Sequence, residues 1–213
     1  CTRLGFARCS DRLLFRMQPT RHRNHRRISR SHGEHFHGQT ALRHSVETGR
    51  KRTITVMQPK SWVIGSRGLL GGALTATLES RYRDLFQPSK RFEWNHHDFV
   101  VDQIRAEVAR FAKSIIPSQC WEIYWAAGPS TMHSPLDSLT TESNYLSTLL
   151  EALGNQPQLL DYPGSFCFSS SAGAIYSGSS ASILNEESSI APTTDYGRQK
   201  LIQEELVSQS KLA

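Results

Sequence analysis

The chain has 213 residues, 38% of them hydrophobic, and a formal net charge of +6. No stretch approaches the ~18 uninterrupted apolar residues of a membrane-spanning helix, which excludes a transmembrane helix. The four cysteines are too scattered for a disulfide framework or a zinc ribbon, and they fit a reducing, cytoplasmic location.

The positive charge is confined to the N-terminal part of the chain. Residues 1–56 carry 13 Lys+Arg and 3 Asp+Glu, whereas residues 57–213 have a net charge of −4. High charge with few apolar groups cannot offset the entropy of ordering a chain, so we predict a disordered basic segment at 1–56 and a folded domain at 57–213. The alternatives for the segment are a nucleic-acid-binding arm, an organellar leader, and a metal site at His32, His35 and His37. We expect neither nucleic acid nor a metal as a partner.

From Met57 onward, short apolar runs alternate with segments of helical spacing. The sequence predicts strands at Ser61–Ile64, Arg91–Asn95, Cys120–Trp125 and Ser165–Phe168. It predicts helices at Ala73–Tyr82, Asp98–Ser114, Leu136–Leu153 and Asp195–Ser210, the last with Asp195 as N-cap. This alternation indicates an α/β fold, a parallel sheet with helices on both faces.

A glycine turn, with Gly65, Gly68 and Gly71, joins the first strand to the first helix. Residues without Cβ let the backbone turn tightly and approach a pyrophosphate, and the helix N-terminus offers that anion unpaired N–H groups. An ordinary strand-to-helix turn is the alternative. The sequence predicts a dinucleotide site formed by the whole turn: Gly65, Ser66, Arg67, Gly68, Leu69, Leu70 and Gly71.

A second pattern, Tyr196-Gly-Arg-Gln-Lys200, lies on the last predicted helix. Positions i and i+4 share a helix face, so the phenol and the ammonium can point into one site. A free phenol, with a pKa of about 10, is a poor base at neutral pH, and a nearby cation favours its ionised form. Two unrelated residues on a surface helix are the alternative.

Together with these two patterns, two further segments agree in order and spacing with a known family. The residues Ala126, Ala127 and Gly128 follow the third strand, and the segment FCFSSSAGAIY, which includes Ser171, follows the fourth. Over residues 61–210 the chain resembles the extended short-chain dehydrogenase/reductase superfamily, in its NAD-dependent epimerase/dehydratase branch. The resemblance implies a Rossmann-type sheet and a cofactor-lining role for the Ala-Ala-Gly segment.

The resemblance also implies roles in catalysis. Tyr196 would exchange a proton with the substrate, and Lys200 would assist it and hold the nicotinamide ribose. Ser171 would orient the substrate oxygen, and Asn144 would support a proton relay near the lysine. The substrate would be a nucleotide-sugar or a similar hydroxyl or carbonyl compound, acted on by an epimerase, dehydratase or reductase.

The cofactor would be NAD or NADP. Family members carry the residue that selects between them at the end of the second strand. Asn95 or His96 is predicted to occupy that position, while Arg67 in the glycine turn could meet a 2′-phosphate, and we lean slightly towards NAD.

The chain stops soon after the last helix, where family members continue into a substrate domain, so we expect a truncated sheet and a fragment. Helices Leu136–Leu153 and Asp195–Ser210 correspond to those that form homodimers in many members. The alternative function is a non-catalytic NAD(P)-binding sensor or scaffold, or an inactive fragment.

Overall fold

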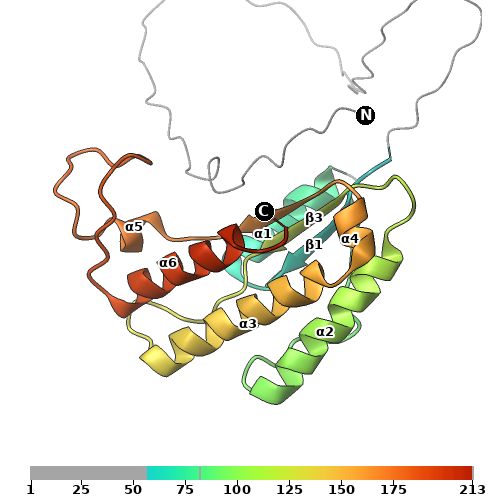
Figure 1. Cartoon of the computed structure of the whole chain (residues 1–213), viewed down its shortest axis with the longest axis horizontal. Coiled ribbons are helices and arrows are strands. Elements are labelled where there is room, and N and C mark those ends of the chain that lie inside the picture. Colours follow the sequence, from blue (N-terminus) through green and yellow to red (C-terminus); the bar gives the residue numbers. More distant parts are fainter. Residues whose placement is uncertain (1–56, 82, 213) are drawn as a thin grey trace, which may run out of the picture. The chain divides into compact units, whose positions relative to one another are not determined.

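The computed structural model describes residues 57–81 and 83–212 (Figure 1). The elements follow the order β1 (Lys60–Ile64), α1 (Leu69–Ser80), β2 (Asp84–Leu85), α2 (His97–Ser114), β3 (Trp121–Trp125), α3 (Leu136–Gly154), α4 (Pro157–Asp161), β4 (Gly164–Phe168), α5 (Ala172–Ile175) and α6 (Asp195–Ser208). The prediction of a disordered basic segment at 1–56, and the alternatives for it, lie outside the described residues. None of the helices within residues 57–81 and 83–212 has the length and apolar character needed to cross a membrane.

The four strands form one parallel sheet in the order β2-β1-β3-β4. The strands are added in opposite directions from β1, because β2 pairs with one edge of β1 and β3 pairs with the other. In such sheets ligands bind outside the carboxyl ends of the strands, at the point where strand order reverses. The predicted α/β, Rossmann-type sheet is therefore confirmed, and its switch point lies at the ends of β1 and β3.

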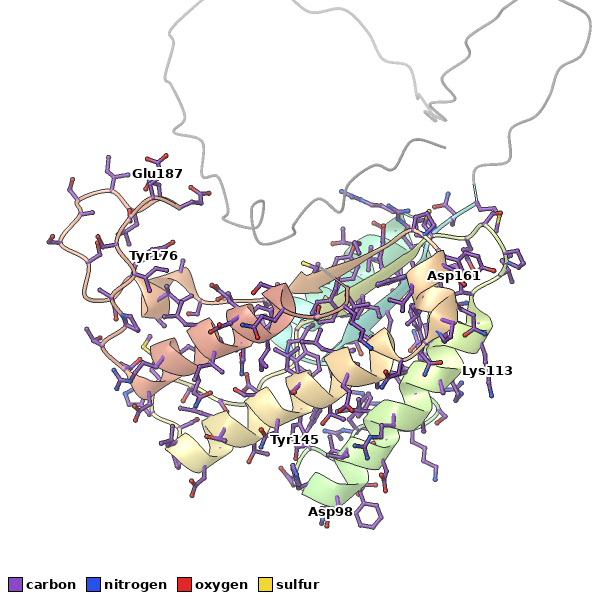
Figure 2. All side chains as sticks on the ribbon, in the orientation of Figure 1. Asp98, Lys113, Tyr145, Asp161, Tyr176 and Glu187 are labelled. Carbon is purple, nitrogen blue, oxygen red and sulfur yellow. The ribbon has the colours of Figure 1, made fainter. Side chains whose placement is uncertain are left out.

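Side chains from alternate strand positions build the main core on one face of the sheet. Trp62 of β1, Ile123 of β3 and Phe166 of β4 are aligned in register on this face and are buried. They pack with the apolar residues of α2 and α3, which recur every three or four positions: Val100, Ile104, Val108, Phe111, Leu146, Leu149, Leu150 and Leu153. Figure 2 shows the side chains that fill the space between the sheet and these helices.

Helices cover both faces of the sheet, but unequally. Figure 1 shows α2, α3 and α6 as neighbours on one side, and α1 lies on the other side against β1 and β2. On the α1 side, the ladder across β3 and β4 presents Glu122, Tyr124, Ser165 and Cys167, none of which is fully buried. This part of the sheet face is polar, as suits a surface in contact with water.

The second strand differs from the prediction. β2 lies at Asp84–Leu85, and residues 91–95 are not paired in the sheet. Phe92 and Trp94, which alternate with polar residues in the sequence, stack their rings on each other with centroids 5.0 Å apart. Trp94 also contacts Trp125 edge-on. The period-2 pattern therefore reflects burial of alternate side chains from an irregular segment, which periodicity alone cannot separate from a strand.

The other predicted strands and the long helices lie within a few residues of their predicted bounds. The short helices α4 and α5 were not predicted, because segments of five and four residues carry too little periodicity. The N-cap of α6 is Thr194 rather than Asp195, since the Thr194 hydroxyl accepts the N–H of Gly197 at 3.1 Å. Asp195 instead pairs with Arg198 one turn later, at 2.8 Å.

Candidate functional site

The glycine turn after β1 needs two of its glycines for different reasons. Gly65 has φ +90°, a conformation that disfavours side chains, and its carbonyl accepts the Gly68 N–H at 2.9 Å. A Cβ on Gly71 would lie 2.1 Å from the Gly65 carbonyl oxygen, so only glycine allows α1 to pack this closely on the turn. The turn thus brings the backbone of residues 65–71 to the carboxyl edge of the sheet.

The start of α1 is open to solvent. The side chains of Ser66 and Arg67 are exposed, and those of Leu69 and Leu70 are 97% and 48% exposed. The first N–H groups of a helix have no partners within it, and the dipole makes that end attractive to anions. An exposed helix N-terminus after a glycine turn is a setting in which a pyrophosphate can bind, and this role stays a prediction for residues 65–71.

The Ala126–Gly128 segment lies directly beside the glycine turn. The Ala126 N–H donates to the Ile64 carbonyl at 2.9 Å, and a Cβ on Gly65 would lie 2.6 Å from the Ala126 backbone. Ala126 and Ala127 are half-buried and Gly128 is exposed. These small residues let the ends of β1 and β3 approach each other at the point where the strand order reverses.

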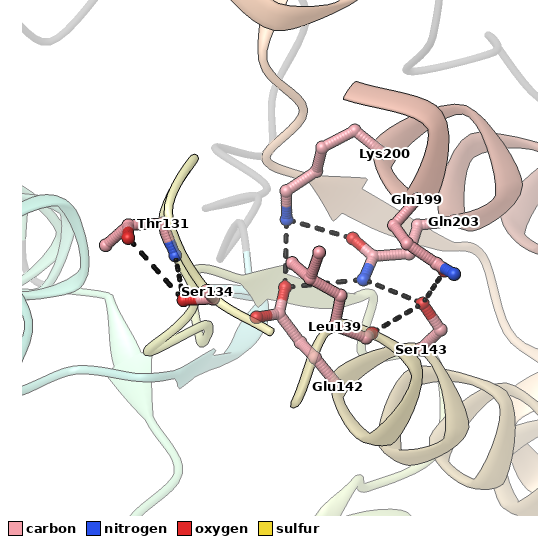
Figure 3. Close-up of polar contacts among 8 residues, drawn as sticks. All are labelled: Thr131, Ser134, Leu139, Glu142, Ser143, Gln199, Lys200 and Gln203. Carbon is pink, nitrogen blue, oxygen red and sulfur yellow. Dashed lines mark hydrogen bonds and ion pairs between the residues drawn. The ribbon is translucent and has the colours of Figure 1, made fainter. Parts of the chain in front are cut away.

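Lys200 belongs to a buried polar network between α3 and α6 (Figure 3). Its Nζ donates to Glu142 Oε1 and to Gln203 Oε1, both at 2.9 Å. The side chains of Lys200 and Glu142 are only 8% and 5% exposed. Gln203 Nε2 donates in turn to Glu142 Oε1 at 3.3 Å and to Ser143 Oγ at 3.1 Å.

Tyr196 and the end of β4 lie next to the same ammonium. Lys200 Nζ is 5.4 Å from the ring centroid of Tyr196 and 5.4 Å from that of Phe168, the last residue of β4. Tyr196 is half-buried. The i, i+4 spacing thus brings phenol and ammonium together at the carboxyl edge of the sheet, as expected from the sequence.

Ser171 comes three residues after the end of β4, at the N-cap of α5. Its carbonyl accepts the N–H groups of Ala174 and Ile175, both at 3.0 Å. The first turn of α6 packs closely on α5, because a Cβ on Gly197 would lie 2.6 Å from the Ala174 carbonyl oxygen. Ser171 and Tyr196 therefore come from adjacent segments, although no hydrogen bond joins their side chains in the described part of the chain.

Asn144 is not brought to Lys200. Its side chain is exposed on α3, and Glu142, two positions earlier, is the residue that meets the ammonium. The buried stripe of α3 includes Leu139, Glu142 and Leu146 at intervals of three and four. That spacing was a signal in the sequence for Glu142, which motif matching alone missed.

Asn95 is likewise away from the end of the second strand. It is exposed in a turn just before α2, whereas β2 ends at Leu85 and continues into Phe86 and Gln87. A small surface pocket adjoins this strand end and the glycine turn, lined by Val63, Ser66, Thr75, Leu85, Phe86, Gln87 and Pro88. The position expected for Asn95 is therefore held by the residues after Leu85.

Comparison with known proteins supports the same reading of the fold. Solved structures with similar folds include a putative epimerase from Burkholderia cenocepacia (TM-score 0.53, 20% identity, 70% of this chain and 49% of that one). RMD from Pseudomonas aeruginosa, complexed with NADPH, has a TM-score of 0.52 and 22% identity over 70% of this chain and 47% of its own. UDP-N-acetylglucosamine 4-epimerase from Bacillus cereus has a TM-score of 0.51 and 14% identity over 71% and 54%. No curated protein matches.

The chain spans about half the length of these solved relatives. The model of the NAD dependent epimerase/dehydratase family matches residues 62–212, which include the glycine turn, the Ala-Ala-Gly segment and the Tyr–Lys helix. This match confirms the NAD-dependent epimerase/dehydratase part of the resemblance and assigns a nicotinamide dinucleotide as the cofactor. On fold, motifs and family model together, the chain belongs to the NAD-dependent epimerase/dehydratase family.

Proposed function

We propose that the chain is the dinucleotide-binding part of an epimerase, dehydratase or reductase that moves a hydride between NAD(P) and a hydroxyl or carbonyl of a nucleotide-sugar-like substrate. The observation that carries the proposal is a continuous line of contacts along the carboxyl edge of the sheet. It runs from Gly65 to Ala126, from Gly128 to Glu142, and from Glu142 through Lys200 to the Tyr196 ring. Cradle, lining segment and acid–base pair thus form one site.

The roles of the side chains follow from their chemistry. When bound, the nicotinamide accepts or donates the hydride. Tyr196 Oη takes the proton of a substrate hydroxyl as it is oxidised and returns it on reduction. The ammonium of Lys200, 5.4 Å from the Tyr196 ring centroid, lies beside the phenol that exchanges the proton. Ser171 Oγ orients the substrate oxygen, whose charge changes during the transfer.

The substrate class rests on relatives rather than on this chain. The Bacillus cereus neighbour is a UDP-N-acetylglucosamine 4-epimerase, and another neighbour, TunA, is an NAD-dependent NDP-hexosamine 5,6-dehydratase. We propose a nucleotide-activated sugar for this protein as well. Figure 2 shows the loop between α5 and α6, with Glu187 on it, projecting from the sheet near Tyr176. The loop joins the short helix capped by Ser171 to the helix that carries Tyr196, and we propose that it contacts the substrate.

The end of β2 favours NADP over NAD. NAD-binding members of such folds use a carboxylate beyond the second strand to bind the ribose 2′-hydroxyl. In this chain the residues that follow β2 are Phe86, Gln87 and Pro88, without a carboxylate, and Arg67 is exposed in the adjoining turn. A guanidinium there would pair with a 2′-phosphate. The displacement of Asn95 from the strand end removes support for the lean towards NAD.

The test separates catalysis from binding. Tyr196→Phe should lower turnover of nucleotide-sugar substrates by about 10²-fold or more, because the proton donor is lost, while the NADPH dissociation constant stays within about threefold. Turnover would be followed by NAD(P)H absorbance or by product analysis, and binding by fluorescence titration. Turnover retained within a few-fold of wild type would refute the assignment of Tyr196.

One observation favours the non-catalytic alternative. Among the described residues, the Lys200 ammonium donates hydrogen bonds to Glu142 and Gln203 and none to Tyr196. A protein that binds NADPH tightly but turns over no nucleotide-sugar, in wild type and Tyr196→Phe alike, would be a dinucleotide sensor or scaffold.

We further propose that α3 and α6 form a homodimer contact, as in many family members. The two helices are bonded side by side through Ser143 and Gln199, at 2.9 Å, and Ile202 of α6 remains 46% exposed. Light scattering after gel filtration should give twice the chain mass, and Ile202→Glu should return it to one chain. A single-chain mass for wild type would refute the contact.

A further inference from the structure

Glu142 of α3 and Lys200 of α6, which are 58 positions apart in sequence, form a buried ion pair. The carboxylate and ammonium are 2.9 Å apart, and each side chain is more than nine-tenths buried. Removing two charges from water is costly, and such a pair persists only where geometry and further hydrogen bonds compensate. A buried pair at the edge where the site is built is therefore a specific arrangement and not a surface contact.

The pair leaves the ammonium partly available. An ammonium has three N–H donors, and the described residues provide two acceptors, Glu142 Oε1 and Gln203 Oε1. The same nitrogen is 5.4 Å from the ring centroids of both Tyr196 and Phe168, the last residue of β4. One donor therefore remains for a further partner at the carboxyl end of β4.

Glu142 is itself held from two sides. Gln203 Nε2 donates to Oε1, while Oε2 is buried without a hydrogen-bond partner among the described residues. On the other side lies Gly128: a Cβ there would come 2.9 Å from Oε1 and 3.1 Å from Oε2. The carboxylate therefore packs against the segment after β3 and ties Lys200 to the cofactor-lining residues.

We propose that Glu142 is a positioning residue, which holds the Lys200 ammonium beside the Ala126–Gly128 segment so that Lys200 can donate to a nicotinamide dinucleotide. This inference rests on the proposed function, because Lys200 is assigned there to dinucleotide binding. Without Glu142 the ammonium would be buried without a counter-charge, and the flexible lysine would turn towards water. That change removes the oriented donor.

The test is a double-mutant cycle on the 213-residue chain, read as the affinity for NADPH and NADH by fluorescence titration. Glu142→Ala should weaken binding about tenfold, and Lys200→Met by a similar factor. Because Glu142 acts through Lys200, the double variant should bind within about twofold of Lys200→Met alone. Glu151→Ala, an exposed glutamate of the same helix, is the matched control and should bind as wild type.

A purely structural role predicts a different result. Glu142→Ala would then lower the melting temperature but leave the affinity of the folded protein unchanged, or the two losses in affinity would multiply in the double variant. Either outcome overturns the proposal. If Glu142→Ala does not fold, Glu142→Gln keeps the shape and one acceptor, and should lose about threefold in affinity, but only where Lys200 is present.

Failure of the proposed function gives another signature. Wild type that binds neither NADPH nor NADH would refute dinucleotide binding itself, and the role of Glu142 with it. Wild type that binds, with an equal loss from Glu142→Gln in the presence and absence of Lys200, would refute only the positioning role.

Discussion

Gly71 and Gly72 are adjacent glycines in α1 with opposite steric surroundings. A Cβ on Gly71 would lie 2.1 Å from the Gly65 backbone oxygen, whereas a Cβ on Gly72 would meet the Ser66 oxygen at an ordinary 3.5 Å. Gly71→Ala must displace the turn, and we expect a loss of about 3 kcal/mol in unfolding free energy together with loss of NADPH binding. Gly72→Ala should stabilise the helix by up to about 1 kcal/mol.

Denaturant unfolding measures the first effect, and fluorescence titration the second. The matched pair separates the close approach of one glycine from the general effect of alanine in a helix. Equal stability and equal NADPH affinity for the two variants would contradict the tight packing of α1 on the turn.

Ionisation of Tyr124 is expected to lower the unfolding free energy of the protein at alkaline pH. Burial, followed by the charge of Glu122 and a 3.2 Å hydrogen bond to its Oε2, raises the pKa of Tyr124 well above the ordinary value. A raised pKa means that the folded state keeps the proton longer than the unfolded chain. The resulting stabilisation is complete below about pH 10, the pKa of a free tyrosine, and is lost as pH rises from there towards the folded pKa.

The unfolding free energy of wild type should therefore fall as pH rises above about 10, by at most about 1.4 kcal/mol per pH unit from this group. Tyr124→Phe should flatten that part of the profile, and Glu122→Gln should flatten it partly, because burial still acts. Urea unfolding at several pH values measures the slope. An identical slope in wild type and Tyr124→Phe would show that Tyr124 does not titrate differently in the folded protein.

Among the elements, the link between β2 and α2 is irregular and is held by side chains, among them Gln103, which donates to the Lys90 and Arg91 carbonyls, and Glu107. Glu107 of α2 is almost completely buried, and its carboxylate accepts the N–H of Ser89 at 3.0 Å as well as the hydroxyl of Ser89. Arg110, one turn further along α2, pairs with its other oxygen. A charged acceptor thus replaces sheet pairing as the anchor of the segment that follows β2.

Glu107→Ala should lower the unfolding free energy by about 2–3 kcal/mol, since it removes the charged acceptor of two hydrogen bonds from Ser89 and the partner of Arg110. Asp102→Ala on the same helix is the control: its carboxylate is 85% exposed and its contact with Arg105 is 3.8 Å, so the change should be within about 0.5 kcal/mol. Chemical denaturation gives both values. Equal effects would mean that Glu107 does not anchor the segment.

The elements also show what sequence patterns can and cannot provide. Helices α2 and α3 were predicted closely because their buried residues repeat over four or five turns. β2 was misplaced because a strand of two residues is too short to show alternating apolar and polar positions. Phe92 and Trp94 show that alternation without forming a strand. The role of Glu142 was overlooked because its ion-pair partner, Lys200, lies on another helix. Its position on a buried stripe of α3 predicts burial but not the identity of that partner.

For the whole molecule, the site depends on contacts between segments far apart in the chain. Sequence motifs predicted the glycine turn, the Ala-Ala-Gly segment and the Tyr–Lys pair, and the parallel sheet brings their strand ends to one edge. The order of motifs could be read from the sequence because each is local. The junctions between them, Gly65 with Ala126 and Gly128 with Glu142, depend on backbone approach in three dimensions and carry no local signal.

Because the proposed dinucleotide site joins β1, α1, β3, α3 and α6, ligand binding should stabilise the folded domain as a unit. A ligand present at 100 times its dissociation constant contributes about 2.7 kcal/mol, and one kcal/mol raises the melting temperature of a domain of this size by about 2–4 °C. NADPH at that excess should therefore raise the melting temperature by roughly 5–10 °C, and NADH at the same concentration by less. Differential scanning fluorimetry measures both, with Gly71→Ala as the variant that should show no shift. A larger shift with NADH would reverse the NADP preference inferred from the end of β2, and no shift with either nucleotide would contradict dinucleotide binding by this chain.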